Sequence, residues 1–127
     1  MNNFIFKNET YQVIGFCMEV QKTLGFGFSE AVYKDAMEIE FLSVEMPHMR
    51  EKELEVEYKG KRLKHKFFAD FVCYDKIIVE VKSSDKGITD DHIAQTLNYL
   101  RVSGNTVGLI INFGKSRLEY KRLVYTF

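Results

Sequence analysis

Three ionisable side chains lie inside a segment of the chain that is otherwise mostly apolar. Residues 67–82 read FFADFVCYDKIIVEVK, in which Asp70, Glu80 and Lys82 interrupt runs of aromatic and aliphatic residues. Burying a charge without a partner costs several kcal/mol, so these groups need one another or a shared partner. The spacing alone leaves two hypotheses open: a divalent metal site, or a buried ion pair in which Lys82 neutralises Asp70 or Glu80.

The same segment has the pattern of a β-hairpin. Residues 67–73 and 77–82 are strand-like, and residues 74–76 form a short polar connection. A hairpin centred on Asp75 sets Asp70 opposite Glu80, so we expect their carboxylates to lie side by side. Both faces are largely apolar, which is typical of a central hairpin in a sheet covered on both sides. Alternation predicts one face with Phe68, Asp70, Val72, Ile78, Glu80 and Lys82, and another with Phe67, Ala69, Phe71, Cys73, Ile77, Val79 and Val81.

Hydrolysis of a phosphodiester is a reaction that suits these residue types. It passes through a doubly charged, pentacovalent arrangement, so the site needs cations near the nonbridging oxygens and a source of hydroxide at neutral pH. Mg²⁺ supplies both, prefers carboxylate oxygens and keeps several waters, which matches Asp70 and Glu80. Lys82 would orient the attacking water and offset charge on the scissile phosphate.

Helical and strand-like patterns on either side of the hairpin predict the elements that must position these residues. The expected helices span about 10–24, from a cap at Ser29 to about 43, and from a cap at Thr89 or Asp90 to a stop at Gly104. The expected strands are 49–58 with a turn at 59–61, the two hairpin strands, 106–112 and 118–126. The order α-α-β-β-β-α-β-β predicts an α/β fold with a central mixed sheet and helices on both faces.

Length and composition limit the chain to one domain. The 127 residues, 46% of them hydrophobic, suffice for one core, so we expect a single domain over 1–127. The 18 basic and 18 acidic residues balance, which counts against tight nonspecific binding of nucleic acid. Cys17 and Cys73 suit buried thiols in a reducing compartment. Because we find neither a signal-peptide pattern nor about 18 consecutive apolar residues, we expect a cytoplasmic protein without membrane contact.

Several short motifs together resemble those of a known family. They are Gly27-x-x-Glu30-x-x-Tyr33, an aspartate ten residues before Glu80-Val81-Lys82, Gln95-x-x-x-Tyr99, and the strand GLIINFG that ends at Gly114. With the order of elements, they resemble the PD-(D/E)xK nuclease superfamily and, more narrowly, the GxxExxY protein family. The resemblance implies a restriction-endonuclease-like core. Two positions depart from the pattern: Gln21 stands where that family usually has His, and Phe26 where it usually has Pro.

The resemblance also implies a catalytic centre. Asp70 and Glu80 match the metal-binding acids, with Mg²⁺ or Mn²⁺ as the expected ion. Lys82 matches the catalytic lysine, and Gln95 the glutamine of the following helix, which we expect to support catalysis. Glu30 matches a helix glutamate that we expect as a further metal ligand. Without the resemblance, a carboxylate at the start of a helix is explained by the helix dipole.

Four further residues are expected to contact substrate. Tyr99 shares a helix face with Gln95, so it would touch a phosphate or a base, although an ordinary polar helix flank has the same pattern. Tyr33 belongs to the first motif and can equally well pack in the core. Lys61 and Lys64 lie in the one dense basic stretch, which suits either phosphate contacts or a solvated turn.

Three hypotheses about function remain open. The first is a metal-dependent nuclease that acts on DNA rather than RNA, aided by a homodimer because 127 residues offer little surface to grip a duplex. The second is a noncatalytic module that binds nucleic acid or protein and has kept the fold, which the zero net charge favours. The third is a purely structural ion pair, with Lys82 between Asp70 and Glu80.

Overall fold

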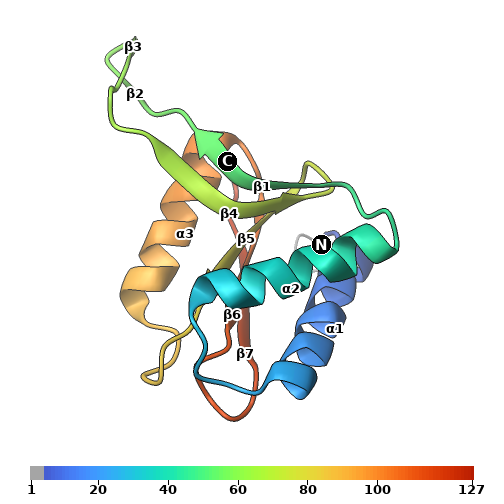
Figure 1. The fold of residues 1–127 in the computed structure, drawn as a ribbon. Helices are drawn as coiled ribbons and strands as arrows, with labels where there is room; N and C mark the ends of the chain where they lie inside the picture. Colours follow the sequence, from blue (N-terminus) through green and yellow to red (C-terminus); the bar gives the residue numbers. More distant parts are fainter. Residues whose placement is uncertain (1–4) are drawn as a thin grey trace.

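The protein folds around a mixed β-sheet, and the computed structural model describes residues 5–127. The sheet has five strands in the order β1-β4-β5-β6-β7, of which β5 and β6 are parallel and the other neighbours antiparallel (Figure 1). The strands are β1 (His48–Leu54), β4 (Phe67–Cys73), β5 (Ile77–Lys82), β6 (Val107–Asn112) and β7 (Glu119–Val124). The helices are α1 (Lys7–Leu24), α2 (Glu30–Ser43) and α3 (Asp90–Ser103). The predicted α/β class is confirmed.

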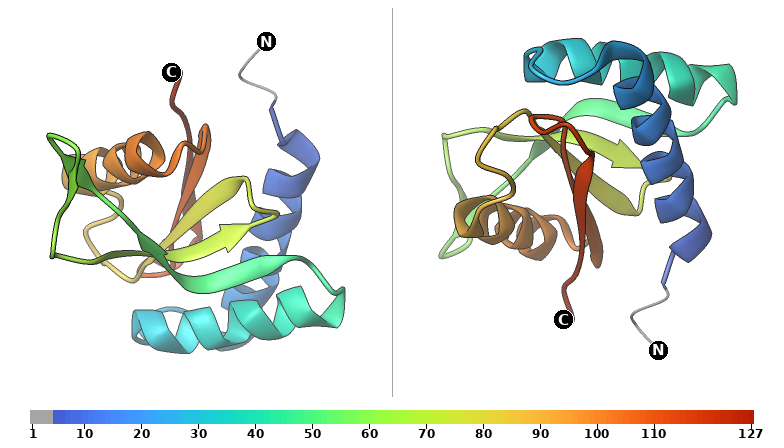
Figure 2. Two further views of the ribbon diagram at one scale, coloured as in Figure 1. Left: turned by 90° about the horizontal axis from the view of Figure 1, so that it is seen from above. Right: turned by 90° about the horizontal axis from the view of Figure 1, so that it is seen from below.

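Helices cover both faces of the sheet, as the two views in Figure 2 show. Helices α1 and α2 lie on one face, where Tyr33 and Phe41 pack with Phe71 and other buried residues of β4, β5 and β6. Helix α3 covers the other face, where Leu100 packs with Ile78 and its neighbours. Because both faces are buried, β5 and β6 are almost continuous apolar runs, and a charged group in β5 is withdrawn from water.

The predicted alternation of side chains in β4 is right from Phe71 onward and wrong before it. Ala69 and Phe67 pack with the α3 cluster, not with the α1 and α2 cluster that contains Phe71. The change of side occurs at Asp70, whose expected partner across β1 is Glu51. Glu51 has a left-handed φ of 54°, and the pairing of β1 with β4 skips these two positions. This kink turns the Asp70 side chain toward α2.

Helix α3 connects the parallel strands β5 and β6 and begins where the sequence predicts. The Thr89 hydroxyl accepts a hydrogen bond from the His92 backbone N–H, and the His92 ring accepts one from the Thr89 N–H. At the other end Gly104 takes a left-handed conformation and stops the helix. A Cβ on Gly108 of β6 would lie 3.0 Å from the Thr96 side chain. This glycine therefore allows α3 to lie close to the sheet.

A small hairpin that the sequence analysis did not predict interrupts the path from β1 to β4. The expected strand over 49–58 ends at Leu54, and β2 (Glu57–Tyr58) pairs with β3 (Lys61–Arg62) outside the main sheet. We call residues 57–66 the basic arm; Figure 1 shows β2 and β3 projecting beyond the sheet. Most of the expected segment is extended, but at the turn over 59–61 the chain reverses, so that Glu57 and Tyr58 pair with β3 and do not continue β1. Among residues 5–127 no helix is long and apolar enough to cross a membrane.

Candidate active site

The hairpin of β4 and β5 has the register predicted from the sequence. Its last paired residues before the kink are Phe71 and Val79, which makes Asp70 and Glu80 the next positions opposite each other. Tyr74 and Asp75 both have positive φ values, 59° and 57°, as the tight turn between twisted strands requires. The turn therefore fixes which acid faces which.

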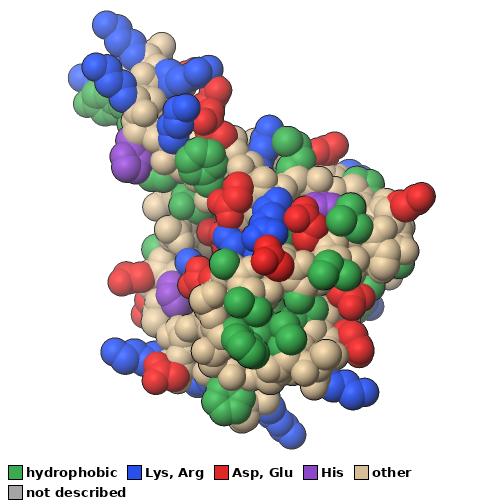
Figure 3. Space-filling view, viewed as in Figure 1, with side chains coloured by type: hydrophobic (Ala, Val, Ile, Leu, Met, Phe, Trp, Pro, Cys, Tyr) green, Lys and Arg blue, Asp and Glu red, His purple; other side chains and the backbone are tan. Residues whose placement is uncertain are grey.

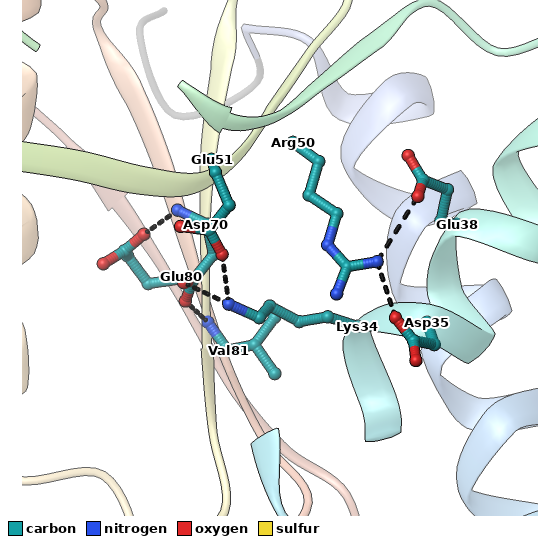
Figure 4. A network of polar contacts seen from close by, with 8 residues as sticks. All are labelled: Lys34, Asp35, Glu38, Arg50, Glu51, Asp70, Glu80 and Val81. Carbon is teal, nitrogen blue, oxygen red and sulfur yellow. Dashed lines mark hydrogen bonds and ion pairs between the residues drawn. The ribbon is translucent and has the colours of Figure 1, made fainter. Parts of the chain in front are cut away.

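The two carboxylates are neighbours, but they do not lie side by side as expected. Glu80 Oε2 accepts a hydrogen bond from the Asp70 backbone N–H at 2.8 Å, and Asp70 Oδ2 accepts one from the Val81 N–H at 2.7 Å. Where β4 and β5 separate, each carboxylate thus accepts a hydrogen bond from a backbone N–H of the other strand, in place of a backbone carbonyl. In Figure 4 the Glu80 carboxylate lies on one side of the hairpin, and Lys34 reaches Asp70 from the other.

Lys34 of α2 is a member of the site that the sequence analysis missed. Its ammonium lies 3.1 Å from Asp70 Oδ1 and 2.5 Å from Glu51 Oε1, and its side chain is 12% exposed (Figure 4). Burial alone would lower the pKa of Lys34, but its hydrogen bonds to Glu51 and Asp70 outweigh burial and raise that pKa. The only signal in the sequence is its position one helical turn after Glu30.

The ion pair of Lys82 with Asp70 or Glu80, one of the two hypotheses that the spacing left open, does not form among residues 5–127. The Lys82 ammonium donates to Gln95 Oε1 at 3.2 Å, while Asp70 pairs with Lys34. The structure thus places Gln95, which the resemblance implies as a supporting residue, in contact with Lys82. Burial and the charge of Lys82 lower the pKa of nearby His92, whereas the charges of Glu30 and Asp91 act in the opposite direction.

Glu80 is the most perturbed acid of the site. Only 3% of its surface is exposed, and burial together with the negative charge of Asp70 raises its pKa to about 8. Among residues 5–127, nothing donates a hydrogen bond to its Oε1 and no cation forms an ion pair with it. A buried carboxylate that lacks a partner on one oxygen favours the binding of a cation or a proton.

Tyr99 of α3 faces the same acids. Burial raises the pKa of its hydroxyl, and the negative charges of Glu80 and Asp70 add to the effect. Its ring contacts Phe67 with 6.4 Å between centroids. The structure thus places Tyr99 between the acid pair and the base of the arm.

The two residues of the first motif have different positions. Glu30 is exposed in the first turn of α2. Within residues 5–127 no three acidic, His or Cys side chains are close enough together to hold a metal, so Glu30 does not complete a triad with Asp70 and Glu80. Tyr33 is fully buried, stacks on Phe113 at 4.2 Å, and donates its hydroxyl to the Gly25 carbonyl at 2.8 Å. The expected contact of Tyr33 with substrate is corrected to a packing role, because no surface of it is accessible.

Lys61 and Lys64 are exposed on the basic arm, away from the acid pair. Figure 3 shows positive side chains gathered over the projecting β2 and β3. Arg62 pairs with Glu55 and Lys66 with Glu53, whereas neither Lys61 nor Lys64 forms an ion pair within the described part of the chain. Two of the expected substrate contacts are therefore available to a phosphate at a distance from the acids.

Asn112 holds the loop that follows Lys82, which the sequence analysis did not foresee. It is fully buried at the end of β6, accepts from the Ser84 N–H at 2.9 Å and donates to the Ser84 carbonyl at 2.9 Å. It also accepts from the Gly114 N–H at 3.1 Å. The motif Asn112-Phe113-Gly114 is the signal that could have identified this role.

The acid pair fits a divalent ion in its donor chemistry. Asp70 and Glu80 would supply two carboxylate ligands, and water the remainder, which is the mixture that Mg²⁺ accepts. The free Oε1 of the buried Glu80 supports this fit. Asp70 is less available, because Lys34 and the Val81 N–H already occupy both of its oxygens.

Comparison with known proteins agrees with the fold. A family model described as the PD-(D/E)XK nuclease superfamily matches residues 7–123. A solved structure, the crystal structure of SSO0001, is similar with a TM-score of 0.59 and 22% identity over 76% of this chain and 50% of that chain. The chain thus spans half the length of that structure, and the likeness concerns the fold. A comparison with curated proteins gave no significant match.

Proposed function

The chain belongs to the PD-(D/E)XK nuclease superfamily, and from this premise we propose that it is a nuclease that hydrolyses phosphodiester bonds with a bound divalent metal ion. The observation that carries the proposal is the pair Asp70 and Glu80, linked through backbone hydrogen bonds near Lys82 and Gln95, with Glu80 buried and Asp70 partly buried. A buried Glu80 next to a second acid is difficult to explain as a stabilising feature, because burying a charged carboxylate costs free energy.

Each residue of the site has a distinct proposed role. Asp70 and Glu80 hold Mg²⁺ or Mn²⁺, which when bound polarises a phosphoryl oxygen and supplies hydroxide at neutral pH. Lys82 donates a hydrogen bond to the attacking water and faces the charge of the scissile phosphate. Gln95 accepts a hydrogen bond from Lys82 and so orients its ammonium. Tyr99 contributes a ring and a hydroxyl next to the acids, where a nucleotide would bind.

Glu30 and its neighbours extend the proposal. The pattern Gly27-x-x-Glu30-x-x-Tyr33 favours membership of the narrower GxxExxY family. Glu30 is proposed as a third acid that joins the site only when metal and substrate are present, since its charge already acts on His92. Calorimetric titration of Mn²⁺ into Glu30→Gln in the presence of uncleaved nucleic acid tests this role.

DNA is the proposed substrate in preference to RNA, because the motifs resemble those of the PD-(D/E)xK nuclease superfamily. Lys61 and Lys64 of the basic arm would contact phosphates away from the cleaved bond.

We also propose that the chain acts as a single domain in the cytoplasm, where reduced Cys17 and Cys73 fit their buried positions. A homodimer is proposed as well, because Ile39 and Leu42 of α2 are 68% and 62% exposed. Sedimentation velocity tests the dimer.

Incubation of pure protein with single-stranded DNA, duplex DNA or RNA plus Mg²⁺ or Mn²⁺ tests the proposal. We expect cleavage that EDTA abolishes and that Lys82→Ala lowers by about 10²- to 10⁴-fold, the usual contribution of a positioned catalytic group. The exposed Lys22→Ala on α1 is the matched control and should retain activity. Cleavage that survives in Lys82→Ala or in EDTA would contradict the mechanism.

A noncatalytic nucleic-acid-binding or protein-interaction module remains the second candidate. Its specific support is Lys34, which already neutralises Asp70 and so reduces the need for a metal ion. Under this alternative, nucleic acid or protein binds without cleavage, and EDTA does not change the affinity. A binding titration with and without Mn²⁺ separates the two candidates.

A further inference from the structure

A cavity lies beside the acid pair, between the base of the basic arm and α3. Its volume is about 410 Å³, within the usual range of small-molecule sites of about 300–1,000 Å³. Phe67, Tyr99 and Val102 supply its apolar walls. Gln95 and Asn98 supply amide groups at its edge. The cavity shares Gln95 and Tyr99 with the proposed catalytic centre, so whatever binds in it lies next to that centre.

The walls present flat aromatic surfaces. The rings of His65 and Phe67 have centroids 4.9 Å apart, and Phe67 is 6.4 Å from Tyr99. Three rings thus lead from the arm toward the acids. Phe67 and Tyr99 are only partly buried and keep surface that faces the cavity. Partly exposed rings of this kind stack nucleobases, because every base has an apolar face.

Two cations fix the orientation of the amides. The Lys82 ammonium donates to Gln95 Oε1, and Arg101 Nη2 donates to Asn98 Oδ1 at 3.1 Å. Ammonium and guanidinium groups can only donate, so both amide oxygens must face them. The NH₂ groups of Gln95 and Asn98 are left, and within residues 5–127 neither donates to a protein atom. The edge of the cavity therefore offers two hydrogen-bond donors.

The two amide donors at the edge of the cavity favour some nucleobases over others. Gln95 and Asn98 are three residues apart on α3, so their Cβ atoms are about 5–6 Å from each other. The Watson–Crick edge of thymine or uracil carries two carbonyl oxygens, which can accept from both amides. The same edge of adenine carries an amino group, which is itself a donor. A base inside a duplex has this edge paired and its faces stacked, so only an unpaired base can enter.

We propose that this cavity binds one unpaired thymine or uracil base of the nucleic acid, adjacent to the phosphodiester whose hydrolysis we assign to the acid pair and Lys82. The proposal rests on the proposed function, since it places the base of the same strand whose backbone is cleaved. Charge supports this occupant: Arg101 lines the cavity, and the basic arm, whose base borders it, carries Lys61 and Lys64.

Binding of oligonucleotides without cleavage tests the proposal. The probe is fluorescein-labelled dT₁₀ in EDTA, with one thymine at a time replaced by adenine, and the readout is fluorescence anisotropy. We expect one position at which adenine weakens binding by about three- to tenfold, the size of one hydrogen bond. In Asn98→Ala, which removes an exposed amide, that position should lose most of its preference while the other positions bind as before.

Two further variants keep the test independent of folding. Phe67→Leu keeps an apolar wall but removes a stacking ring, so it should weaken dT₁₀ and reduce the effect of an abasic nucleotide at the sensitive position. The matched control Asn105→Ala changes an amide outside this cavity and should behave as the wild type. Equal sensitivity at all positions, or an unchanged preference in Asn98→Ala, overturns the proposal.

The outcomes separate this proposal from the proposed function. Metal-dependent cleavage without any base preference leaves the nuclease assignment in place and overturns the base site. A base preference that depends on Asn98 without cleavage under any metal condition supports the base site and contradicts the nuclease assignment. If no oligonucleotide binds at low salt, both are overturned.

Discussion

The ammonium of Lys34 on α2 lies 3.1 Å from Oδ1 of Asp70 on β4, so the acid of the hairpin is neutralised by a helix lysine and not by Lys82. Glu51, in its left-handed conformation, accepts from the same ammonium. Asp70 therefore has a cation in place before any metal binds. Lys82 is left to interact with Gln95, beside the position where a substrate phosphate would lie.

Replacing Lys34 by Met should make the site more responsive to metal. Without the ammonium, Asp70 loses its ion-pair partner, and we expect the free energy of unfolding to fall by about 1–3 kcal/mol in EDTA. A metal ion no longer competes with Lys34 for Oδ1, so Mn²⁺ should raise the Tm of Lys34→Met by more than it raises that of the wild type. Lys22→Met, an exposed change on α1, is the control. Equal Mn²⁺-induced shifts in wild type and Lys34→Met would refute the competition.

Glu80 should make stability fall as the pH rises. Its pKa is about 8 in the folded protein and 4.5 as its ordinary value, so between these pH values the folded state holds a proton that the unfolded state has released. The folded state binds more protons, and therefore stability decreases across this window and is unaffected below it. The Glu80→Gln variant cannot titrate at this position, so its stability should not show this decrease with pH.

The difference in unfolding free energy between Glu80→Gln and the wild type should therefore grow from pH 5 to pH 8. Its expected size at pH 8 is on the order of a few kcal/mol, at about 1.4 kcal/mol per unit of pKa difference. Urea denaturation in EDTA at pH 5, 6.5 and 8 measures it. The exposed Glu57→Gln is the matched control and should give a constant difference. A pH-independent difference for Glu80→Gln would contradict the raised pKa.

Gly114 should be intolerant of any side chain. A Cβ at this position would lie 2.3 Å from the backbone of Ser84, in the loop after Lys82. We expect Gly114→Ala to lower stability by about 1–3 kcal/mol and to reduce cleavage, because displacement of this loop moves Lys82. Gly15→Ala in α1, where nothing lies within 4 Å, should instead stabilise the protein by about 0.5–1 kcal/mol. Thermal unfolding of both variants checks the contrast.

The basic arm should contribute affinity without sequence preference. Replacing Lys61 and Lys64 by Ala should weaken binding of all oligonucleotides alike, and each change should reduce the slope of log affinity against log salt by about 1. Lys121→Ala on β7, the strand at the opposite edge of the sheet, is the control. Anisotropy titrations from 50 to 200 mM salt measure the slopes. An unchanged slope would exclude phosphate contacts by the arm.

Local sequence was enough to predict the elements and the register of the central hairpin. The turn at Tyr74 and Asp75 and the alternation from Phe71 onward are decided by neighbours in the chain, so period and turn residues reveal them. The contact of Lys82 with Gln95 was not predicted; it forms because a short connection joins the end of β5 to α3.

The kink at Glu51 and Asp70 and the basic arm could not be predicted from the local sequence pattern. Residues 49–58 have the pattern of one strand, yet the structure breaks it at Leu54 and turns Glu51 into a left-handed conformation. A strand pattern records which residues tolerate extended backbone, and it does not record where the sheet must twist to receive a helix.

What the sequence determined by itself is the chemical content of the site: two acids opposite each other, a lysine after them, and a glutamine and a tyrosine on one helix face. Only the tertiary structure decided their partners. Lys34 and Asp70 are 36 residues apart, and they meet because the packing of α2 on the sheet places that helix face over the kink in β4. Contacts of this kind depend on the angle and depth at which a buried face packs, and those are set by the whole core and not by any local pattern.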